Sequence, residues 1–273
     1  MPRLARDGSV WAPIALALAL AITHFLAGAP RQAAIASAPE GVGACPSSIE
    51  FGQAVQCYLP AQDQAQGYTF VAQAGDKVLA RMGASGDVYG FSPMIQIYAP
   101  GGGKSWCQAG QQGYLVAEIA SCSLPSDGTY TLVAFRSEAT SADTYGLYLQ
   151  RLNNPGHAAP IGFAQTLDGS IQPSVQMDAY TFTAAAGDRA HLKMTRDGAA
   201  AGFYPAIRLY GPDGAKLCEA GSDGGAVAEI ADCGLTDGGR YSILAYSFDG
   251  LHQDSYTLSL AGWEVYLPLV TRN

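Results

Sequence analysis

The feature that most constrains the fold is a cysteine-bounded segment that occurs twice in the chain. Cys107 and Cys122 bound the first copy, and Cys218 and Cys233 bound the second, with a spacing of 15 positions in both. In each copy the sequence Ala-Glu-Ile-Ala leads into the second cysteine, and a glycine-containing turn follows it. Alternating apolar residues followed by a glycine turn predict a half-buried β-strand and its successor.

The duplication extends well beyond these segments. Residues 49–150 match residues 161–261 at an offset of 112 positions, with shared Ile-x-Phe, Tyr-Thr-Phe and Ala-Gly-Asp motifs. One extra residue before Cys107 lowers the offset to 111, which then holds as far as Tyr145 and Tyr256. A single slip over so long a stretch indicates a duplicated structural unit.

Each copy predicts short strands and no sustained helix. Ile95 and Ile97 alternate with Gln96, and comparable runs recur between Gly, Pro and Asp turns. This pattern is typical of an antiparallel sandwich or barrel. We therefore expect an all-β protein of two tandem antiparallel β-sandwich domains. Tyr130 and Tyr241 begin equivalent strands; each either anchors a corner by a hydroxyl-to-backbone hydrogen bond or is a plain core tyrosine.

The N-terminus has the features of a secretory signal peptide. Arg3 and Arg6 precede an apolar run over 11–26, and Ala34-Ile35-Ala36 offers a cleavage site. An uncleaved membrane anchor is the alternative, although Thr23 and His24 interrupt the run. No later segment is apolar enough to span a bilayer, so we expect no span in the mature chain. The predicted organisation is a signal peptide 1–36, sandwiches 37–152 and 161–262, a linker 153–160 and an apolar tail 263–273.

An even number of cysteines in an exported protein favours disulfides. The predicted bridges are Cys107–Cys122, Cys218–Cys233 and, from the two that remain, Cys45–Cys57. A metal site would need clustered ligands, and the histidines lie far from these pairs in sequence. We expect each repeated bridge to hold the two strands of a hairpin in register.

The charge excludes one class of partner. The formal net charge is −8, and it becomes −10 without residues 1–36, which hold three arginines and one aspartate. An acidic surface repels phosphate backbones, so we expect no nucleic-acid partner.

With these motifs in place, each unit resembles the bacterial pre-peptidase C-terminal domain, an extracellular β-sandwich of jelly-roll type. The resemblance rests on Ile-x-Phe, on Tyr-x-Phe followed by Ala-Gly-Asp, and on Leu-Pro-Ser-Asp-Gly-Thr-Tyr before a closing Tyr-x-Leu-x-Leu. It covers both repeats. Some relatives bind calcium through acidic residues before the Tyr-x-Phe strand; the second copy keeps Asp178 there, whereas the first has Gln64-Ala-Gln66.

The sequence carries no motif of a catalytic site. It contains no G-x-S-x-G, H-E-x-x-H or P-loop pattern. His191 and His252 lie beside aspartates in a predicted strand and a turn, as surface histidines do. Glu118 and Glu229 are repeat-equivalent, so they belong to separate units and do not form a glycosidase pair. We predict that the protein is not an enzyme and needs no cofactor.

Two equivalent loops carry aromatic residues and are the candidate binding loops. Their rings either stack on sugars or dock a partner protein, or they plug the ends of the sandwiches. The candidates are Tyr89, Phe91, Trp106, Phe203 and Tyr204. Calcium at Asp87, Asp178, Asp188 or Asp213 is a further option without a D-x-D-x-D run to support it, and we expect no metal site.

These observations predict an exported, non-catalytic protein, secreted or held at the cell surface. The expected role is recognition, adhesion or scaffolding, with a glycan or an extracellular protein as partner. The alternative is an accessory carbohydrate- or protein-binding module for a separate secreted hydrolase.

Overall fold

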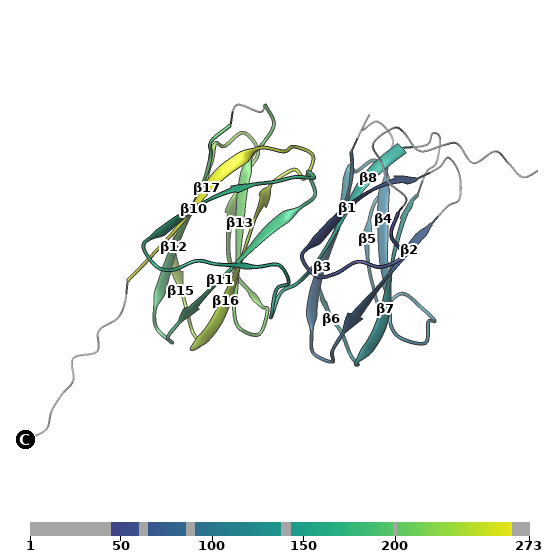
Figure 1. The fold of residues 1–273 in the computed structure, drawn as a ribbon, viewed down its shortest axis with the longest axis horizontal. Helices are drawn as coiled ribbons and strands as arrows, with labels where there is room; N and C mark the ends of the chain where they lie inside the picture. Colours follow the sequence, from purple (N-terminus) through teal and green to yellow (C-terminus); the bar gives the residue numbers. More distant parts are fainter. Residues whose placement is uncertain (1–44, 60–64, 86–90, 138–142, 199–200, 264–273) are drawn as a thin grey trace, which may run out of the picture. The chain divides into compact units, whose positions relative to one another are not determined.

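The computed structural model describes residues 45–59, 65–85, 91–137, 143–198 and 201–263, which form the two β-sandwiches of Figure 1. These residues form strands, turns and bends without a helix, so the all-β prediction is confirmed. In this part of the chain no helix is long and apolar enough to cross a membrane. The predicted signal peptide, Asp87, Tyr89 and the tail beyond residue 263 lie outside the described residues.

The first sandwich consists of two four-stranded sheets. Their strand orders are β1-β8-β3-β6 and β2-β7-β4-β5. The strands are β1 (Gln53–Leu59), β2 (Gln66–Ala72), β3 (Lys77–Ala84), β4 (Pro93–Tyr98), β5 (Cys107–Gly110), β6 (Val116–Ser123), β7 (Gly128–Arg136) and β8 (Asp143–Arg151).

The second sandwich repeats this order. Its sheets are β10-β17-β12-β15 and β14-β13-β16-β11-β9. The strands are β9 (Ala159–Pro160), β10 (Gln165–Ser170), β11 (Met177–Ala184), β12 (Arg189–Arg196), β13 (Pro205–Tyr210), β14 (Lys216–Gly221), β15 (Val227–Gly234), β16 (Gly239–Ser247) and β17 (Ser255–Trp263).

Apart from β9, the two halves correspond strand for strand, and both have the two-sheet jelly-roll architecture. All pairings between neighbouring strands are antiparallel except that of β9, which runs parallel to β11. Two residues lie in the second sandwich although the predicted boundaries left them outside it. Pro160, from the predicted linker, pairs with Thr181 of β11, and Trp263, from the predicted tail, ends β17 and pairs with Arg189 of β12.

Alternation along the strands fills each sandwich. In β7, Tyr130, Leu132 and Ala134 are buried, whereas the intervening residues face outward. Their second-sandwich counterparts in β16 are also buried. The Tyr130 hydroxyl donates to the Ser126 carbonyl at 2.8 Å, and the Tyr241 hydroxyl donates to the Asp237 carbonyl at 2.5 Å. Both tyrosines therefore anchor a corner as well as filling a core.

The three predicted cysteine pairs lie at disulfide distance, with Cα separations of 5.4 Å for Cys45–Cys57, 6.1 Å for Cys107–Cys122 and 6.3 Å for Cys218–Cys233. The prediction that each repeated bridge joins the two strands of a hairpin is wrong. Strand β5 pairs with β4 in one sheet, and β6 pairs with β3 in the other. The repeated bridges therefore join the two sheets of each sandwich. Two cysteines 15 residues apart can lie on the two strands of a hairpin or on strands of different sheets. The spacing alone therefore could not distinguish a hairpin bridge from a bridge between sheets.

Candidate functional site

The two sandwiches bury opposite outer faces against each other. The described residues from Cys45 onward belong to one compact unit. Within it, an apolar cluster combines residues of both halves. We call the outer face of β3, β6 and β8 the receiving face (Leu79, Arg81, Gly83, Glu118, Gly146, Tyr148) and the outer face of β11, β13, β14 and β16 the docked face (Ala179, Ala206, Arg208, Tyr210, Glu219, Leu244, Tyr246).

The apolar side chains of this junction are as buried as those of the two sandwich cores. Leu79 and Tyr148 of the receiving face are fully buried, and Leu244 of the docked face is 1% exposed. The Tyr148 hydroxyl donates to the carbonyl of Met177 at 2.7 Å, so its polar end is satisfied. Each such side chain contributes about 1.5–3 kcal/mol relative to its exposed state. The junction therefore holds the sandwiches together as one body.

A pair of glycines allows the close approach. Gly83 of β3 and Gly146 of β8 are opposite each other in the sheet. A Cβ at Gly83 would lie 2.8 Å from Val175, and one at Gly146 would lie 2.6 Å from it. Val175, fully buried, occupies the space that two side chains would otherwise fill. Any larger residue at either position would push the second sandwich away.

Charged side chains complete the junction. Glu118 of β6 accepts a hydrogen bond from Arg208 of β13 at 2.5 Å, and its other oxygen lies 3.4 Å from Nε of Arg81. Arg81 also donates to the carbonyls of Ser247 and Phe248 at 3.2 and 3.1 Å. Both guanidinium groups lie about 5 Å from the ring of Tyr246.

This network is buried, and its ionisation reflects that. Arg81 is 3% exposed, and desolvation lowers the pKa of its guanidinium although Glu118 acts in the opposite sense. Burial is also the largest single influence on the pKa of Arg208 and acts to lower it, but the interactions with Glu118, Tyr246 and Tyr210 together outweigh burial, and the net pKa is raised. Two buried cations share one carboxylate, so loss of Glu118 would leave both without their shared partner.

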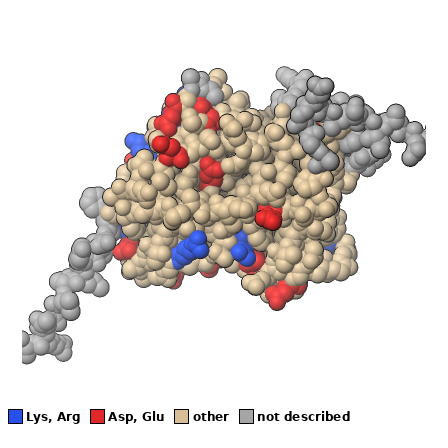
Figure 2. All heavy atoms as spheres, in the orientation of Figure 1, with Lys and Arg blue, Asp and Glu red and all other residues tan. Residues whose placement is uncertain are grey.

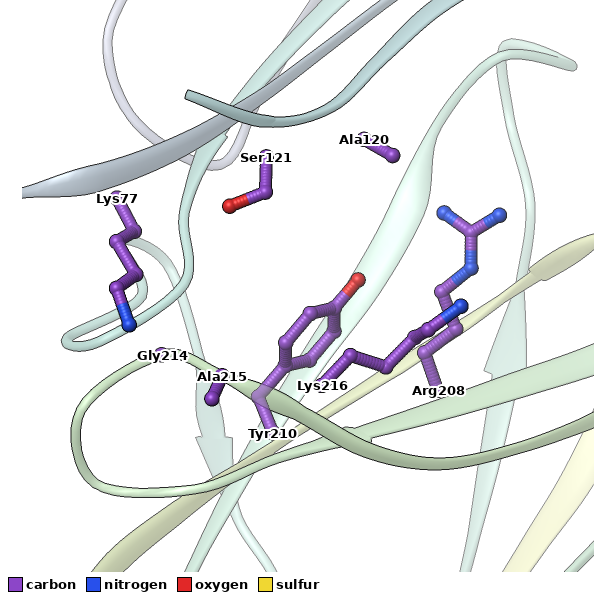
Figure 3. Close-up of a pocket in the computed structure, with 8 residues that line it drawn as sticks. All are labelled: Lys77, Ala120, Ser121, Arg208, Tyr210, Gly214, Ala215 and Lys216. Atoms are coloured by element: carbon purple, nitrogen blue, oxygen red, sulfur yellow. The ribbon is translucent and has the colours of Figure 1, made fainter. Parts of the chain in front are cut away.

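A small cavity of about 160 Å³ lies at the edge of the junction (Figure 3). The Tyr210 hydroxyl points toward the strand that carries Ala120 and Ser121. Lys77 pairs with Asp213, and Lys216 pairs with Glu219. Carboxylates outside the lining thus neutralise the two lysines of this cavity.

The first sandwich has a face that corresponds to the docked face of the second. No strand of the first sandwich covers it, and we call it the open face. This open face is the outer side of β2, β4, β5 and β7. Val71 is 72% exposed, and Met94, Tyr98, Val133 and Phe135 are half-buried and belong to none of the three cores formed by the described residues. Its members are Gly67, Thr69, Val71, Met94, Gln96, Tyr98, Gln108, Gly110, Thr129, Thr131, Val133 and Phe135.

Among its described residues, the open face carries no ionisable group except the Tyr98 phenol. Gln96 and Gln108 stand where the docked face has Arg208 and Glu219. The Tyr98 hydroxyl donates to Gln96 Oε1 at 2.7 Å, and Gln96 Nε2 donates to Gln108 Oε1 at 3.3 Å. Amide and hydroxyl groups on this face are therefore already ordered across β4 and β5.

A groove of about 350 Å³ adjoins the open face beside Val71, with Glu50 and Phe51 on its other wall. The second sandwich has the corresponding groove, of about 510 Å³, lined by Gly162, Thr183 and Arg240 among others. The Arg240 guanidinium is hydrogen-bonded to Thr181 at 3.1 Å there.

The remaining outer face, of β10, β12, β15 and β17, is charged. We call it the far face (Arg189, His191, Lys193, Glu229, Asp232, Ser259). Arg189 pairs with Asp232, and His191 lies 2.8 Å from Glu229. On the side of the molecule shown in Figure 2, acidic patches are more prominent than basic ones, in keeping with the net charge of −8.

Two of the predicted binding residues are core residues. Phe91 is 1% exposed and Phe203 is fully buried. Phe91 packs in the first core and Phe203 in the second. Their rings are therefore unavailable for stacking or docking, and the alternative that they plug the sandwiches is the one observed. The physical reason is their place directly before β4 and β13, where the chain turns inward.

The other aromatic candidates do not form one site. Trp106 is 53% exposed and donates through its indole N–H to the carbonyl of Ser123 at 2.8 Å. Its backbone N–H donates to Ile97 near the end of β4, whereas Phe91 precedes the start of that strand. Tyr204 is half-buried in the second sandwich.

The aspartates considered for calcium are dispersed. Asp213 pairs with Lys77, and Asp188 accepts the backbone N–H of Ala185 at 2.8 Å within a turn. No group of three acidic, His or Cys side chains suited to a metal occurs among the described residues. Asp178 instead accepts a hydrogen bond from Tyr256 inside the second sandwich at 2.6 Å.

Asp178 and its counterpart Gln66 cap equivalent tyrosine pairs. Tyr256 and Tyr180 share a hydrogen bond of 2.8 Å beneath Asp178. In the first sandwich, Tyr145 donates to Gln66 Oε1 at 2.6 Å. Burial raises the pKa of the Asp178 carboxyl, although the hydrogen bonds from Tyr256 and Gln176 act to lower it.

Sequence reasoning missed the junction and the open face. The signal was present in the differences between the copies. Leu79 and Tyr148 correspond to His191 and Ser259, and Gly83 corresponds to Thr195. An outward-facing position that is apolar or glycine in one copy and polar in the other indicates a surface that is buried in one half and exposed in the other.

No model of a protein family matches this chain, and no curated protein matches it in sequence. Solved structures do match. The pre-peptidase C-terminal domain of a collagenase from Bacillus anthracis is 22% identical, with 39% of this chain and 97% of that chain covered and a TM-score of 0.33. PliG of Aeromonas hydrophila, a periplasmic inhibitor of g-type lysozyme, is 21% identical, with 39% and 96% covered and a TM-score of 0.30. The PBSX exported protein XepA is 13% identical, with 78% and 87% covered and a TM-score of 0.24.

Proposed function

We propose that the protein is an exported, non-catalytic recognition module whose contact surface is the open face of the first sandwich. One observation carries the proposal: the face of the second sandwich that corresponds to the open face is already used for docking within the chain. The open face has the same strand order as the docked face, and it presents apolar and amide groups outward.

The character of the open face supports recognition of an uncharged surface. Val71, Val133 and Phe135 offer apolar area, and Gln108 offers an amide. Such a surface suits contact with an apolar protein face or with the rings and hydroxyls of a glycan. A charged ligand would lose water there without gaining a counter-charge.

The described histidines support a non-catalytic role. His191 pairs with Glu229 and His252 pairs with Asp249, and both are partly exposed. Each is a local surface pair on one sandwich. The cysteine pairs at disulfide distance fit an oxidising compartment, and hence export.

The experiment is retention of beads coated with the mature chain on immobilised glycans, on extracellular proteins and on the chain itself. Phe135→Lys places a charge in the open face, and Ser259→Lys places the same charge on the far face as a control. We expect Phe135→Lys to abolish retention and Ser259→Lys to preserve it. Equal retention of both variants, or no retention of the wild type on any surface, would refute the proposal.

A further inference from the structure

The junction demonstrates how this fold pairs its outer faces. In the second sandwich, Leu244 and Tyr246 of β16 pack on the sheet face of another sandwich. Their counterparts on the open face are Val133 and Phe135 of β7. The apolar positions are thus conserved between the two halves, whereas the charged positions that select the receiving face are replaced by Gln96 and Gln108.

These replacements decide which partner fits. The receiving face needs a cation opposite Glu118, which Arg208 supplies at 2.5 Å. Gln96, at the equivalent position of the open face, carries no charge. A second chain docked in the manner of the junction would therefore supply no cation in place of Arg208, and Glu118 would keep only Arg81. In this chain, moreover, the receiving face is already covered.

The far face of another chain is also a poor partner. It presents Lys193, Glu229 and the pair Arg189–Asp232, all of them partly exposed. An uncharged sheet laid over these groups would remove water and supply no counter-charge, which is costly. Open-ended stacking of chains through these two faces is therefore disfavoured.

The open face of a second copy needs no cation from its partner and presents no charged group that would be covered. It brings no ionic charge, it presents apolar side chains to apolar side chains, and it brings amides such as Gln108 that both donate and accept. We infer that the occupant of the open face is the same face of a second copy of this chain, an inference that rests on the proposed function. A surface that pairs with itself is closed by a two-fold axis and ends at a dimer.

The size of the face sets the strength of the pairing. Four strands about 4.8 Å apart and about six residues long give roughly 400 Å² for each partner. The pair buries roughly 800 Å², which is typical of weak and transient association. Many such contacts between two coated surfaces act together, so weak pairing still supports adhesion.

The test is the mass of the mature chain in solution, measured by sedimentation equilibrium from about 1 µM to about 500 µM, a range that spans weak affinities. We expect the wild type and Ser259→Lys to approach twice the monomer mass at the upper end. Phe135→Lys should remain a monomer throughout. A chain ending at residue 263 should still dimerise, which excludes the apolar tail as the contact.

A cross-linking variant gives an independent readout. Thr131 lies on the central strand β7 of the open face, so Thr131→Cys should give a disulfide-linked dimer on mild oxidation. Thr257→Cys, on the far face, should give at least ten-fold less. Dimers that persist in Phe135→Lys, or equal cross-linking at both positions, would overturn the inference.

The outcomes separate this inference from the proposed function. If the wild type stays a monomer but its beads bind a glycan or another protein in a way that Phe135→Lys abolishes, recognition stands and the self-pairing is wrong. If Phe135→Lys changes neither mass nor retention, both proposals are wrong.

Discussion

In the first sandwich the outer face of β3 and β8 carries Leu79 and Tyr148, whereas the same positions of the second sandwich hold His191 and Ser259. The opposite holds for the other sheet, where Leu244 and Tyr246 of the second sandwich are buried and Val133 and Phe135 of the first are half-exposed. Both halves have one strand order, so the fold does not decide which face is covered. A few outward-facing side chains decide it.

The difference also shows how a duplicated unit becomes asymmetric. The inward-facing residues are nearly unchanged between the halves because each must fill the same sandwich. The outward-facing residues have diverged so that one face of each copy accepts the other. Among the described residues, two outer faces then remain outside the junction: the far face, which is charged, and the open face, which is uncharged.

The strongest test of this comparison is removal of Glu118 beside removal of its counterpart Glu229. Glu118→Ala leaves Arg81 buried without its counter-charge, and we expect a loss of about 3–5 kcal/mol in the free energy of unfolding. Glu229 is paired at the surface with His191, and Glu229→Ala should cost about 0.5 kcal/mol. Chemical denaturation of both variants measures the contrast. Equal losses would mean that the junction does not depend on its buried ion pairs.

Loss of the repeated disulfide should cost the same stability in the two halves, whereas the outer faces of the two halves differ. Each repeated bridge closes a loop of 15 residues, and its loss is worth about 3 kcal/mol. We expect Cys107→Ser and Cys122→Ser to lose the same amount, and Cys218→Ser to lose a similar amount in its own half. Peptide mapping of the unreduced protein provides the check. A link between the halves, or free thiols at these four positions, would contradict the pairing.

The sequence was sufficient for the fold because alternation and turn chemistry are local. Ile95 and Ile97 point inward in any sheet of the right register, and repetition of the pattern showed that the unit occurs twice. The cysteine spacing was not sufficient for the role of the bridge, because β5 and β6 are neighbours in sequence yet belong to different sheets.

The candidate site was less accessible to prediction than the fold. Burial of Phe91 depends on where the chain turns before β4, which alternation does not encode. The junction depends on contacts between residues about 90 to 170 positions apart, such as Glu118 with Arg208 and Arg81 with Ser247. The need for glycine at positions 83 and 146 becomes clear only when the position of Val175 is known, although the threonines at the equivalent positions 195 and 257 of the second copy were visible in the sequence.

The smallest expected effect concerns Gln66 and Asp178, the half-buried caps of the tyrosine pairs, where the halves differ by one carboxyl. Burial raises the pKa of Asp178 above its ordinary value of 3.8. A carboxyl whose pKa is higher in the folded state binds its proton more tightly there, so the folded protein loses stability as the pH rises through the interval between the unfolded and folded pKa. Asp178→Asn should therefore be more stable than the wild type at neutral pH, and the difference should shrink as the pH falls through the raised pKa of Asp178 toward 3.8.

Gln66→Glu in the first sandwich is the mirror experiment. It places a carboxyl beneath Tyr145 and Tyr68, where the wild type has a neutral amide that accepts from both hydroxyls at 2.6 and 3.1 Å. Desolvation should raise the pKa of the new carboxyl too, so this variant should be less stable than the wild type at neutral pH and should recover on acidification. Thermal unfolding of the two variants from acid to neutral pH measures both differences. If Asp178→Asn were instead destabilising at every pH, the hydrogen bond from Tyr256 to a charged oxygen would outweigh desolvation, and the two caps would differ in kind.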